Sequence, residues 1–159
     1  MFMWSIDRRS EIWQTDDMTE KRQDNRDLSG LRFEIREEPT NDELNGLFAE
    51  SWPDHASTDF VPVLTHSLTY VACRSEGELV GFVNVAWDGG VHAFLLDTTV
   101  RPDWRRRGVG TRLVEIAAAE AAQLGMQWLH VDYTRMYEPF YRRCGFRPTL
   151  AGLIDLSKR

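Results

Sequence analysis

The stretch VRPDWRRRGVGTRLVEIAAAEAAQLG, Val100–Gly125, decides how this chain is interpreted. Three arginines precede Gly-Val-Gly, and a helical pattern begins directly after the second glycine. The first amide N–H groups of a helix have no partner within it, and they attract anions together with the positive end of the helix dipole. Gly108 and Gly110 let the backbone approach a bulky phosphate. The stretch is consistent with an anion site and, equally, with a surface loop that caps a structural helix.

Two common phosphate-binding loops do not fit this stretch. A dinucleotide-binding fingerprint requires a third glycine where Leu113 stands. A P-loop requires Gly-Lys followed by Ser or Thr, and no lysine is present here. If the stretch binds an anion, it does so in a site of another kind.

The composition indicates one acidic globular domain. The chain has 159 residues, a net charge of −6, 42% hydrophobic residues and 28% charged residues. The acidic balance argues against nucleic-acid binding, which needs a positive field, and is compatible with a cationic substrate. Cys73 and Cys144 show neither metal-ligand spacing nor a disulfide framework, so we expect no metal and a cytoplasmic location. Because no long apolar run precedes Asp7, we expect neither a signal peptide nor a membrane span.

The pattern along the chain predicts two regions. Residues 1–30 form a polar N-terminal arm, either partly disordered or docked on the domain or a partner, and residues 31–159 form the domain. Alternating residues predict a strand near 31–38, and Thr40 or Asn41 caps a helix. A short helix or loop, three strands across 68–100, a helix over 111–124, a strand over 126–133 and a short helix over 138–144 follow. Residues 146–156 are predicted as a last strand pair or a strand and tail.

The arginine-glycine loop resembles a known family motif. Arg105 to Gly110 is similar to the Arg/Gln-x-x-Gly-x-Gly/Ala segment of the GNAT superfamily, the acyl-CoA N-acyltransferases. EPFYRRCGF (138–146) and ELVGFVNVAWDG (78–89) resemble two further pieces of that family. The resemblance covers residues 31–156. It implies an α/β (α+β) fold with a mixed, mostly antiparallel sheet, splayed between its two central strands, and helices on both faces.

The resemblance implies that acetyl-CoA is the cosubstrate of an N-acetyltransferase, without a metal. The pyrophosphate would lie on the backbone amides of residues 106–111. The implied cofactor residues are Thr98, Thr99, Val100, Arg105, Arg106, Arg107, Gly108, Val109, Gly110, Thr111, Thr134 and Tyr141. At Thr134 the family often has asparagine. An amine would attack the thioester directly in a ternary complex. The N–H of Val100 would face the thioester carbonyl, and Tyr141 would protonate the departing thiolate, unless that tyrosine simply packs.

The general base is left open by the sequence. Some family members carry a glutamate where this chain has Phe94. The alternatives are Asp97 or His92, with His130 and Asp132 nearby, or a water chain. On a regular strand, His92 would share a face with Phe94 and Val100, and Asp97 would point to the other face.

The acceptor is predicted to be a primary amine on a small molecule or a peptide. Trp52, Asp54, Trp87 and Asp88 are the candidate pocket residues, because acids can hold an ammonium and tryptophans can wall a cleft. No nucleic-acid or membrane partner is expected, and a homodimer is left open. The alternative function is a non-catalytic acyl-CoA-binding module, which the missing strand glutamate favours and Tyr141 disfavours.

Overall fold

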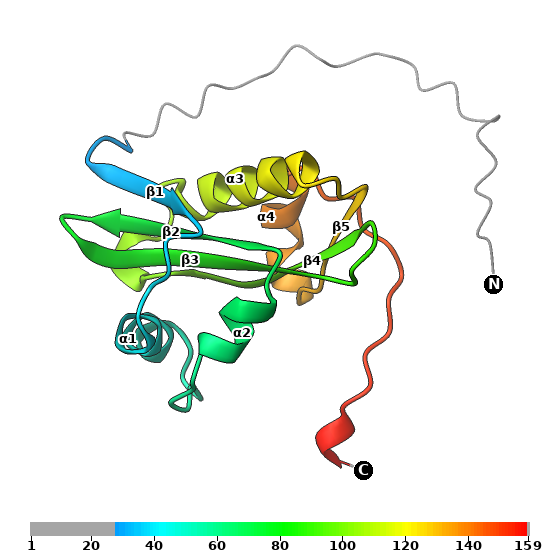
Figure 1. Cartoon of the computed structure of the whole chain (residues 1–159), viewed down its shortest axis with the longest axis horizontal. Helices are drawn as coiled ribbons and strands as arrows, with labels where there is room; N and C mark the ends of the chain where they lie inside the picture. Colours follow the sequence, from blue (N-terminus) through cyan, green and yellow to red (C-terminus); the bar gives the residue numbers. More distant parts are fainter. Residues whose placement is uncertain (1–27, 159) are drawn as a thin grey trace.

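The computed structural model describes residues 28–158, so the predicted arm lies outside the described residues except for 28–30, and its boundary stays a prediction. Strands and helices alternate along this part of the chain (Figure 1). They are β1 (Leu31–Ile35), α1 (Asn41–Ser51), α2 (Val61–His66), β2 (Thr69–Ser75), β3 (Glu78–Trp87), β4 (His92–Val100), α3 (Val109–Gln123), β5 (Trp128–Val131) and α4 (Glu138–Arg143). Short 3₁₀ turns lie at Pro102–Trp104, Arg135–Tyr137 and Leu156–Lys158.

The five strands form one sheet in the order β1-β2-β3-β4-β5. Neighbouring strands are antiparallel except β4 and β5, which are parallel. The β4–β5 pairing runs from His92↔Trp128 to Leu95↔Val131 and then stops, whereas β4 continues to Val100. The predicted mixed sheet, splayed between these strands, is therefore confirmed.

Helices cover both faces of the sheet, as predicted (Figure 1). On one face, α3 presents a buried residue at every fourth position, Val109, Leu113, Ala117 and Ala121. This stripe packs on Val71, Val83 and Val85, and we call this cluster the α3-side core. On the other face, Leu44 and Phe48 of α1 pack on Tyr70 and Phe82, and we call this cluster the α1-side core.

A β-bulge interrupts β4 next to the splay. Phe82 pairs with Thr99 and Asn84 with Leu96, so one residue of β3 lies opposite Asp97 and Thr98 of β4. Asp97 has a φ of 56°, in the left-handed region. The extra residue reverses the alternation of side chains along the strand. Phe94 and Leu96 lie on the α1 side, whereas Val100 packs against the α3-side core. The prediction that Phe94 and Val100 share a face is wrong for this reason.

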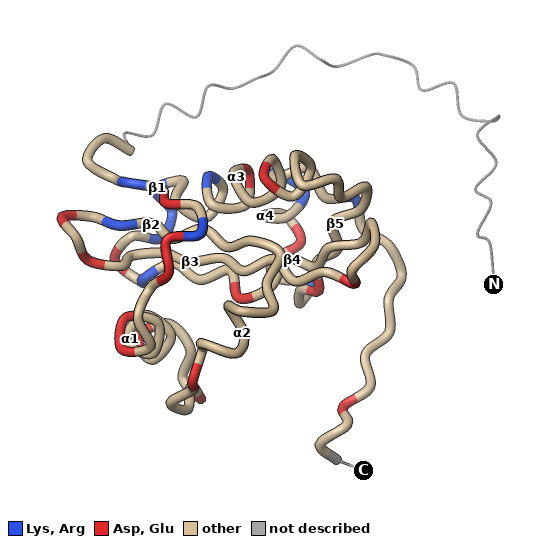
Figure 2. Tube along the Cα trace, in the orientation of Figure 1, with Lys and Arg blue, Asp and Glu red and all other residues tan. Residues whose placement is uncertain are grey.

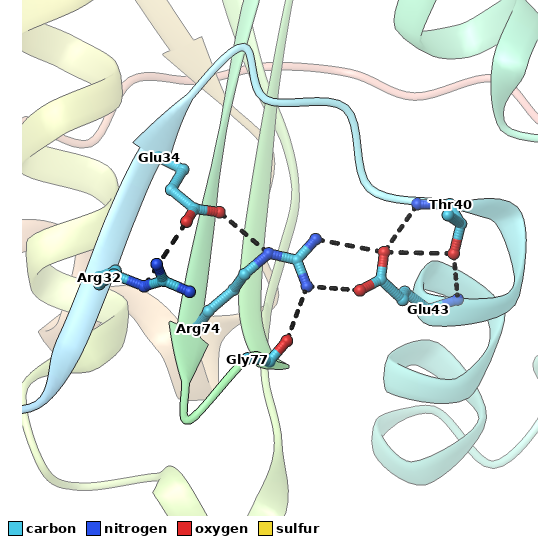
Figure 3. Close-up of polar contacts among 6 residues, drawn as sticks. All are labelled: Arg32, Glu34, Thr40, Glu43, Arg74 and Gly77. Atoms are coloured by element: carbon cyan, nitrogen blue, oxygen red, sulfur yellow. Dashed lines mark hydrogen bonds and ion pairs between the residues drawn. The ribbon is translucent and has the colours of Figure 1, made fainter.

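The start of α1 is tied to the sheet by charged side chains (Figure 3). Thr40 and Glu43 form a capping box, in which Thr40 N–H donates to Glu43 Oε2 at 2.8 Å. Glu43 also accepts hydrogen bonds from Arg74 of β2, whose Nε donates to Glu34 of β1 at 2.9 Å. The Arg74 guanidinium, aided by the Thr40 amide, lowers the pKa of Glu43 to about 2.

The last segment differs from its prediction. Between Arg147 and Lys158 the described chain contains no strand and only the turn at Leu156–Lys158. Leu150 and Leu153 are 105% and 89% exposed. Pro148 cannot donate a ladder hydrogen bond and Gly152 weakens a strand, so the apolar pattern alone does not hold this segment on the sheet.

Among residues 28–158, no helix is both long enough and apolar enough to cross a membrane. The same residues contain no group of three or more His, Cys, Asp or Glu side chains arranged to hold a metal ion.

Candidate active site

The N-terminus of α3 is open at its first turn. Gly108 precedes the helix with a φ of 91°, a conformation that favours glycine, and no side chain caps the helix. The first intrahelical bond runs from Arg112 N–H to Gly108 O at 3.0 Å. The amides of Val109, Gly110 and Thr111 therefore lack partners within the helix.

The two long helices begin in different ways. The first turn of α1 has a threonine cap and two acids, Asp42 and Glu43. The first turn of α3 has neither a capping side chain nor an acid. Partial positive charge at this end of α3 is thus left for an external anion, which is what a phosphate group requires.

The three arginines before this helix are exposed and partly anchored. Arg105 Nε donates to Val100 O at 3.0 Å, and the Arg107 guanidinium lies 4.8 Å from the Trp104 ring centroid. Arg106 has a φ of 64°. The predicted loop therefore carries its positive charge in a defined position beside the start of α3.

The free edge of β4 faces the same region. Arg101 N–H donates to Val80 O of β3 at 2.9 Å. Because successive amides of a strand point to opposite edges, the Val100 amide points away from β3. On that side β5 has already ended, opposite Leu95. The Val100 N–H thus has the direction that a donor to a thioester oxygen needs.

Tyr141 lies beneath this opening, buried in α4 with 9% of its surface exposed. Its ring stacks on Tyr133 at 4.9 Å and meets Phe140 and Phe146 edge-on. Burial raises the pKa of the Tyr141 phenol, and the nearby Thr98 hydroxyl opposes this by a smaller amount, although the two groups do not form a hydrogen bond. The phenol therefore carries its proton at neutral pH.

Three elements converge at Gly110. A Cβ added there would lie 3.4 Å from the Phe140 ring of α4 and 3.5 Å from Val100 Cγ2 of β4. The structure thus brings the start of α3, the end of β4 and α4 together. Thr134 is exposed just before the turn at Arg135–Tyr137. Thr99 faces the opposite side, where its Oγ1 accepts from Trp52 Nε1 at 3.1 Å.

A cavity of about 390 Å³ lies on the α1 side, at the end of that helix. It is lined by Phe48, Trp52, Pro53, Asp54, His55, Ala56, Thr58 and Phe60. Asn45 fixes its wall, because Asn45 Oδ1 accepts from Thr58 N–H at 2.9 Å and lies 2.9 Å from His55 Nε2. The cavity is therefore preformed and largely aromatic.

The four predicted pocket residues do not form one pocket. Trp52 and Asp54 line the cavity. Trp87 instead pairs with Ala93, which packs in the α3-side core, so its side chain belongs to the other face of the sheet. Asp88 accepts from Gly90 N–H at 2.7 Å within the turn that follows β3. Of the four residues, only Trp52 and Asp54 therefore share a cavity.

The two predicted bases differ in position. Asp97 lies in the bulge, where burial raises the pKa of its carboxyl and the nearby Asn84 side chain opposes this by a smaller amount. His92 lies eight residues before Val100, about 25 Å along a strand. Its Nδ1 is 2.9 Å from Nε2 of His130, which lines a separate cavity of about 230 Å³ together with Asp132. Only Asp97 lies near the free edge of β4.

Sequence reasoning missed Asn84. It is 1% exposed, and its Oδ1 has no hydrogen-bond partner among the described residues. The available signal was its isolation as a polar residue within the otherwise apolar run VGFVNVAW, 80–87. Buried polar groups normally have partners, so such a residue marks a position to examine.

Known proteins resemble this chain along most of its length. Residues 33–146 match the Acetyltransferase (GNAT) family. Streptothricin acetyltransferase of Streptomyces lavendulae is 29% identical over 124 residues, which cover 76% of this chain and 66% of that protein. Aminoglycoside N(6')-acetyltransferase type 1 of Stenotrophomonas maltophilia is 30% identical over 116 residues, 62% of this chain and 74% of that protein. Mycothiol acetyltransferase of Nocardia farcinica is matched over only 21% of its length. The chain thus spans less than two thirds of the length of the streptothricin and mycothiol acetyltransferases.

Solved structures of acetyltransferases share the fold of this chain. A protein from Deinococcus radiodurans R1 assigned as an acetyltransferase superposes with a TM-score of 0.71 and 26% identity, covering 84% of this chain and 93% of that chain. Aminoglycoside N-acetyltransferase AAC(6')-Iy, solved in complex with CoA, shares the fold with a TM-score of 0.63 and 18% identity, over 80% of this chain and 96% of that chain. From the family match over residues 33–146 and this shared fold, the chain belongs to the GNAT family of acetyltransferases.

Proposed function

We propose that this protein transfers an acetyl group from acetyl-CoA to a primary amine by direct attack in a ternary complex. The observation that carries the proposal is the meeting of the uncapped start of α3 with the free edge of β4 at Gly110. The first would hold a phosphate group, and the second offers the Val100 N–H to the thioester oxygen. Membership of the family and a structural neighbour solved with CoA support the choice of cosubstrate.

The cosubstrate would lie between β4 and α4. The amides of residues 106–111 and the guanidinium groups of Arg105 to Arg107 would hold its pyrophosphate. The chain of the cosubstrate that carries the thioester would run along β4, beside Thr98, Thr99 and Val100. Thr134 and Tyr141 would lie on its other side. The Thr99 side chain faces Trp52, so only its backbone would contribute.

In the proposed reaction, Asp97 takes one proton from the acceptor ammonium. The neutral nitrogen then attacks the thioester carbon, a C–N bond forms and the C–S bond breaks. Tyr141 donates its proton to the departing sulfur and regains one from the nitrogen through solvent. Overall, an ammonium and acetyl-CoA yield an amide, a free thiol and one proton. The raised pKa values of Asp97 and Tyr141 suit a base and an acid respectively.

The aromatic cavity beside Trp52 would receive the body of the acceptor. Relatives named for streptothricin and aminoglycosides indicate cationic antibiotics as the first acceptors to try. The test is thiol release from acetyl-CoA across a panel of small amines, aminoglycosides and peptide N-termini, with the product identified by mass. Stabilisation of the protein by CoA without transfer to any amine would instead favour an acyl-CoA-binding module.

The proposed phosphate site at the start of α3 can be tested with a matched control. Gly108 and Gly77 both have a φ of 91°, so replacing either with alanine imposes a similar backbone strain of about 1 kcal/mol. We expect Gly108→Ala to lower CoA affinity at least tenfold, whereas Gly77→Ala, in the β2–β3 turn, leaves affinity unchanged. Equal CoA affinities, measured by calorimetry on the two folded variants, would contradict the proposed phosphate site at the start of α3.

A further inference from the structure

We propose that Asn84 and Asp97 together form the subsite that receives the reacting ammonium group of the acceptor. The proposal rests on the proposed function and deepens it, because it assigns the subsite a second residue that the sequence did not reveal. In it, the Asn84 Oδ1 and the Asp97 carboxylate each accept one N–H of the ammonium. Asn84 is a positioning residue, and Asp97 takes the proton.

The first observation is a buried hydrogen-bond acceptor atom without a donor. Asn84 is 1% exposed, and its Oδ1 has no partner among the described residues. Asn84 pairs with Leu96, next to Asp97, and its side chain lies close enough to lower the pKa of the Asp97 carboxyl against the effect of burial. The carboxylate favours the orientation in which Nδ2 faces it and Oδ1 points away, because only Nδ2 can donate to a carboxylate. Leaving a buried carbonyl oxygen unpaired is costly, so the site is complete only when a donor binds there.

The second observation is the position of the Asn84 Oδ1 in the sheet. Asn84 lies between Phe82, which is buried in the α1-side core, and the half-buried Ala86. Its partner in β4 is Leu96, which is 41% exposed. The Oδ1 therefore lies at the boundary where the cover of α1 and α2 ends and the open face of the sheet begins.

The third observation is the bulge itself. A non-glycine residue in the left-handed region costs free energy, and Asp97 occupies it with a φ of 56°. The bulge places this carboxyl beside Asn84 instead of on the α3 side, where regular alternation would put it. Asp97 also belongs to the same strand as Val100, three residues before it, and the Val100 amide points away from β3. The strained geometry thus joins the base to the transfer site.

The chemistry of the two oxygens selects the ligand. Both are acceptors, one neutral and one anionic, and an anion or a carbonyl would find no donor between them. A primary ammonium supplies three donors and one positive charge, which matches a half-buried carboxylate that has no ion-pair partner among the described residues. A quaternary ammonium has the charge but no donor, so the subsite discriminates between the two cations.

The first test needs no acceptor and no turnover. We expect NH₄Cl, added to the CoA-saturated full-length protein, to shift the Asn84 side-chain amide resonances and the Asp97 carboxyl ¹³C resonance. Tetramethylammonium chloride at equal ionic strength should leave both in place. Equal responses to the two salts would overturn the subsite.

The second test uses Asn84→Leu, which keeps the side-chain volume, beside Thr69→Val. Thr69 is fully buried with an unpartnered hydroxyl, but it packs on the α3 side of the sheet, away from Asn84. With the fastest amine of the panel, we expect Asn84→Leu to raise KM at least tenfold while CoA stabilisation is retained. Thr69→Val should leave KM unchanged. A KM within twofold of the wild type for Asn84→Leu would overturn the subsite but leave the proposed function standing.

The two proposals fail differently. An ammonium-specific shift in a wild-type protein that acetylates no amine would refute acetyl transfer and support the subsite. The resonance test also decides the matter if Asn84→Leu does not fold, because it uses the wild-type chain.

Discussion

Tyr141 shows how burial can prepare a single side chain for a chemical role. Its ring is enclosed by Tyr133, Phe140 and Phe146, and this burial raises the pKa of the phenol. We expect Tyr141→Phe to lower kcat at neutral pH about 100-fold, because a proton donor to the leaving thiolate is lost. Unfolding free energy and CoA affinity should change little, since the ring remains.

The matched control for this prediction is Tyr133→Phe. It removes a phenol hydroxyl from the ring stacked on Tyr141 and leaves the Tyr141 hydroxyl in place. Its kcat should stay close to that of the wild type. If Tyr141→Phe turns over at the wild-type rate while chemistry limits turnover, Tyr141 only packs and the thiolate leaves without its help.

At this scale, the sequence indicates which groups are available but not their partners. Val100, Gly108 and Tyr141 could be proposed as site residues from the sequence because they fall within contiguous motifs. Asn84 was not, because the missing partner of its Oδ1 depends on side chains brought in from other strands. Trp87 was misplaced for the same reason, since one step along a strand exchanges the faces of the sheet.

Among the elements, α1 depends on the charged cluster of Figure 3. The Glu43 carboxylate accepts from Thr40 and Arg74, which together with the Arg74 charge hold its pKa at about 2, below the ordinary 4.5. A lowered folded-state pKa stabilises the protein above the unfolded value, and this stabilisation is lost as pH falls from about 4.5 to about 2. We therefore expect Glu43→Gln to lower the unfolding free energy at pH 7 by about 1–3 kcal/mol.

The measurement is urea unfolding of wild type and Glu43→Gln across pH 7 to pH 3. The difference between them should shrink over the lower half of this range. Asp42→Asn is the control, because Asp42 lies in the same first turn of α1 without a contact to Arg74. A difference that stays constant between pH 7 and pH 3 would mean that the carboxylate charge of Glu43 contributes nothing.

The elements themselves were largely predictable, whereas their irregularities were not. Apolar periodicity and the capping residues located α1, and α3 begins at Val109 instead of the predicted Thr111. The bulge at Asp97 has no sequence signature comparable to a glycine turn, and it reversed the predicted faces of β4. Residues 146–156 were predicted as a last strand pair or a strand and tail, but strand formation depends on a paired neighbour that the sequence does not specify.

Across the whole molecule, charge divides along the chain more sharply than its net value of −6 suggests. Between Glu37 and Cys73 there are seven acidic residues and neither lysine nor arginine. Figure 2 shows acidic positions on α1 and in the loop that follows it. One of these acids, Asp54, lines the aromatic cavity. Between Arg101 and Arg112 there are five arginines and one acid. The proposed acceptor side is thus negative and the proposed cosubstrate side positive.

This division predicts that the acceptor is attracted over a distance. At saturating acetyl-CoA, we expect kcat/KM for a cationic amine to fall severalfold as NaCl rises from about 20 to about 300 mM, because the Debye length shortens from about 20 Å to under 10 Å. Glu50→Gln combined with Asp54→Asn should flatten this dependence, since both acids lie at the end of α1 or in the loop beyond it. The control is Glu120→Gln on α3, which removes an acidic charge on the opposite face of the sheet. This variant should keep the salt dependence of the wild type. If kcat/KM does not depend on salt, or if all these variants respond alike, the acidic stretch plays no part in acceptor capture and its charges serve only solvation.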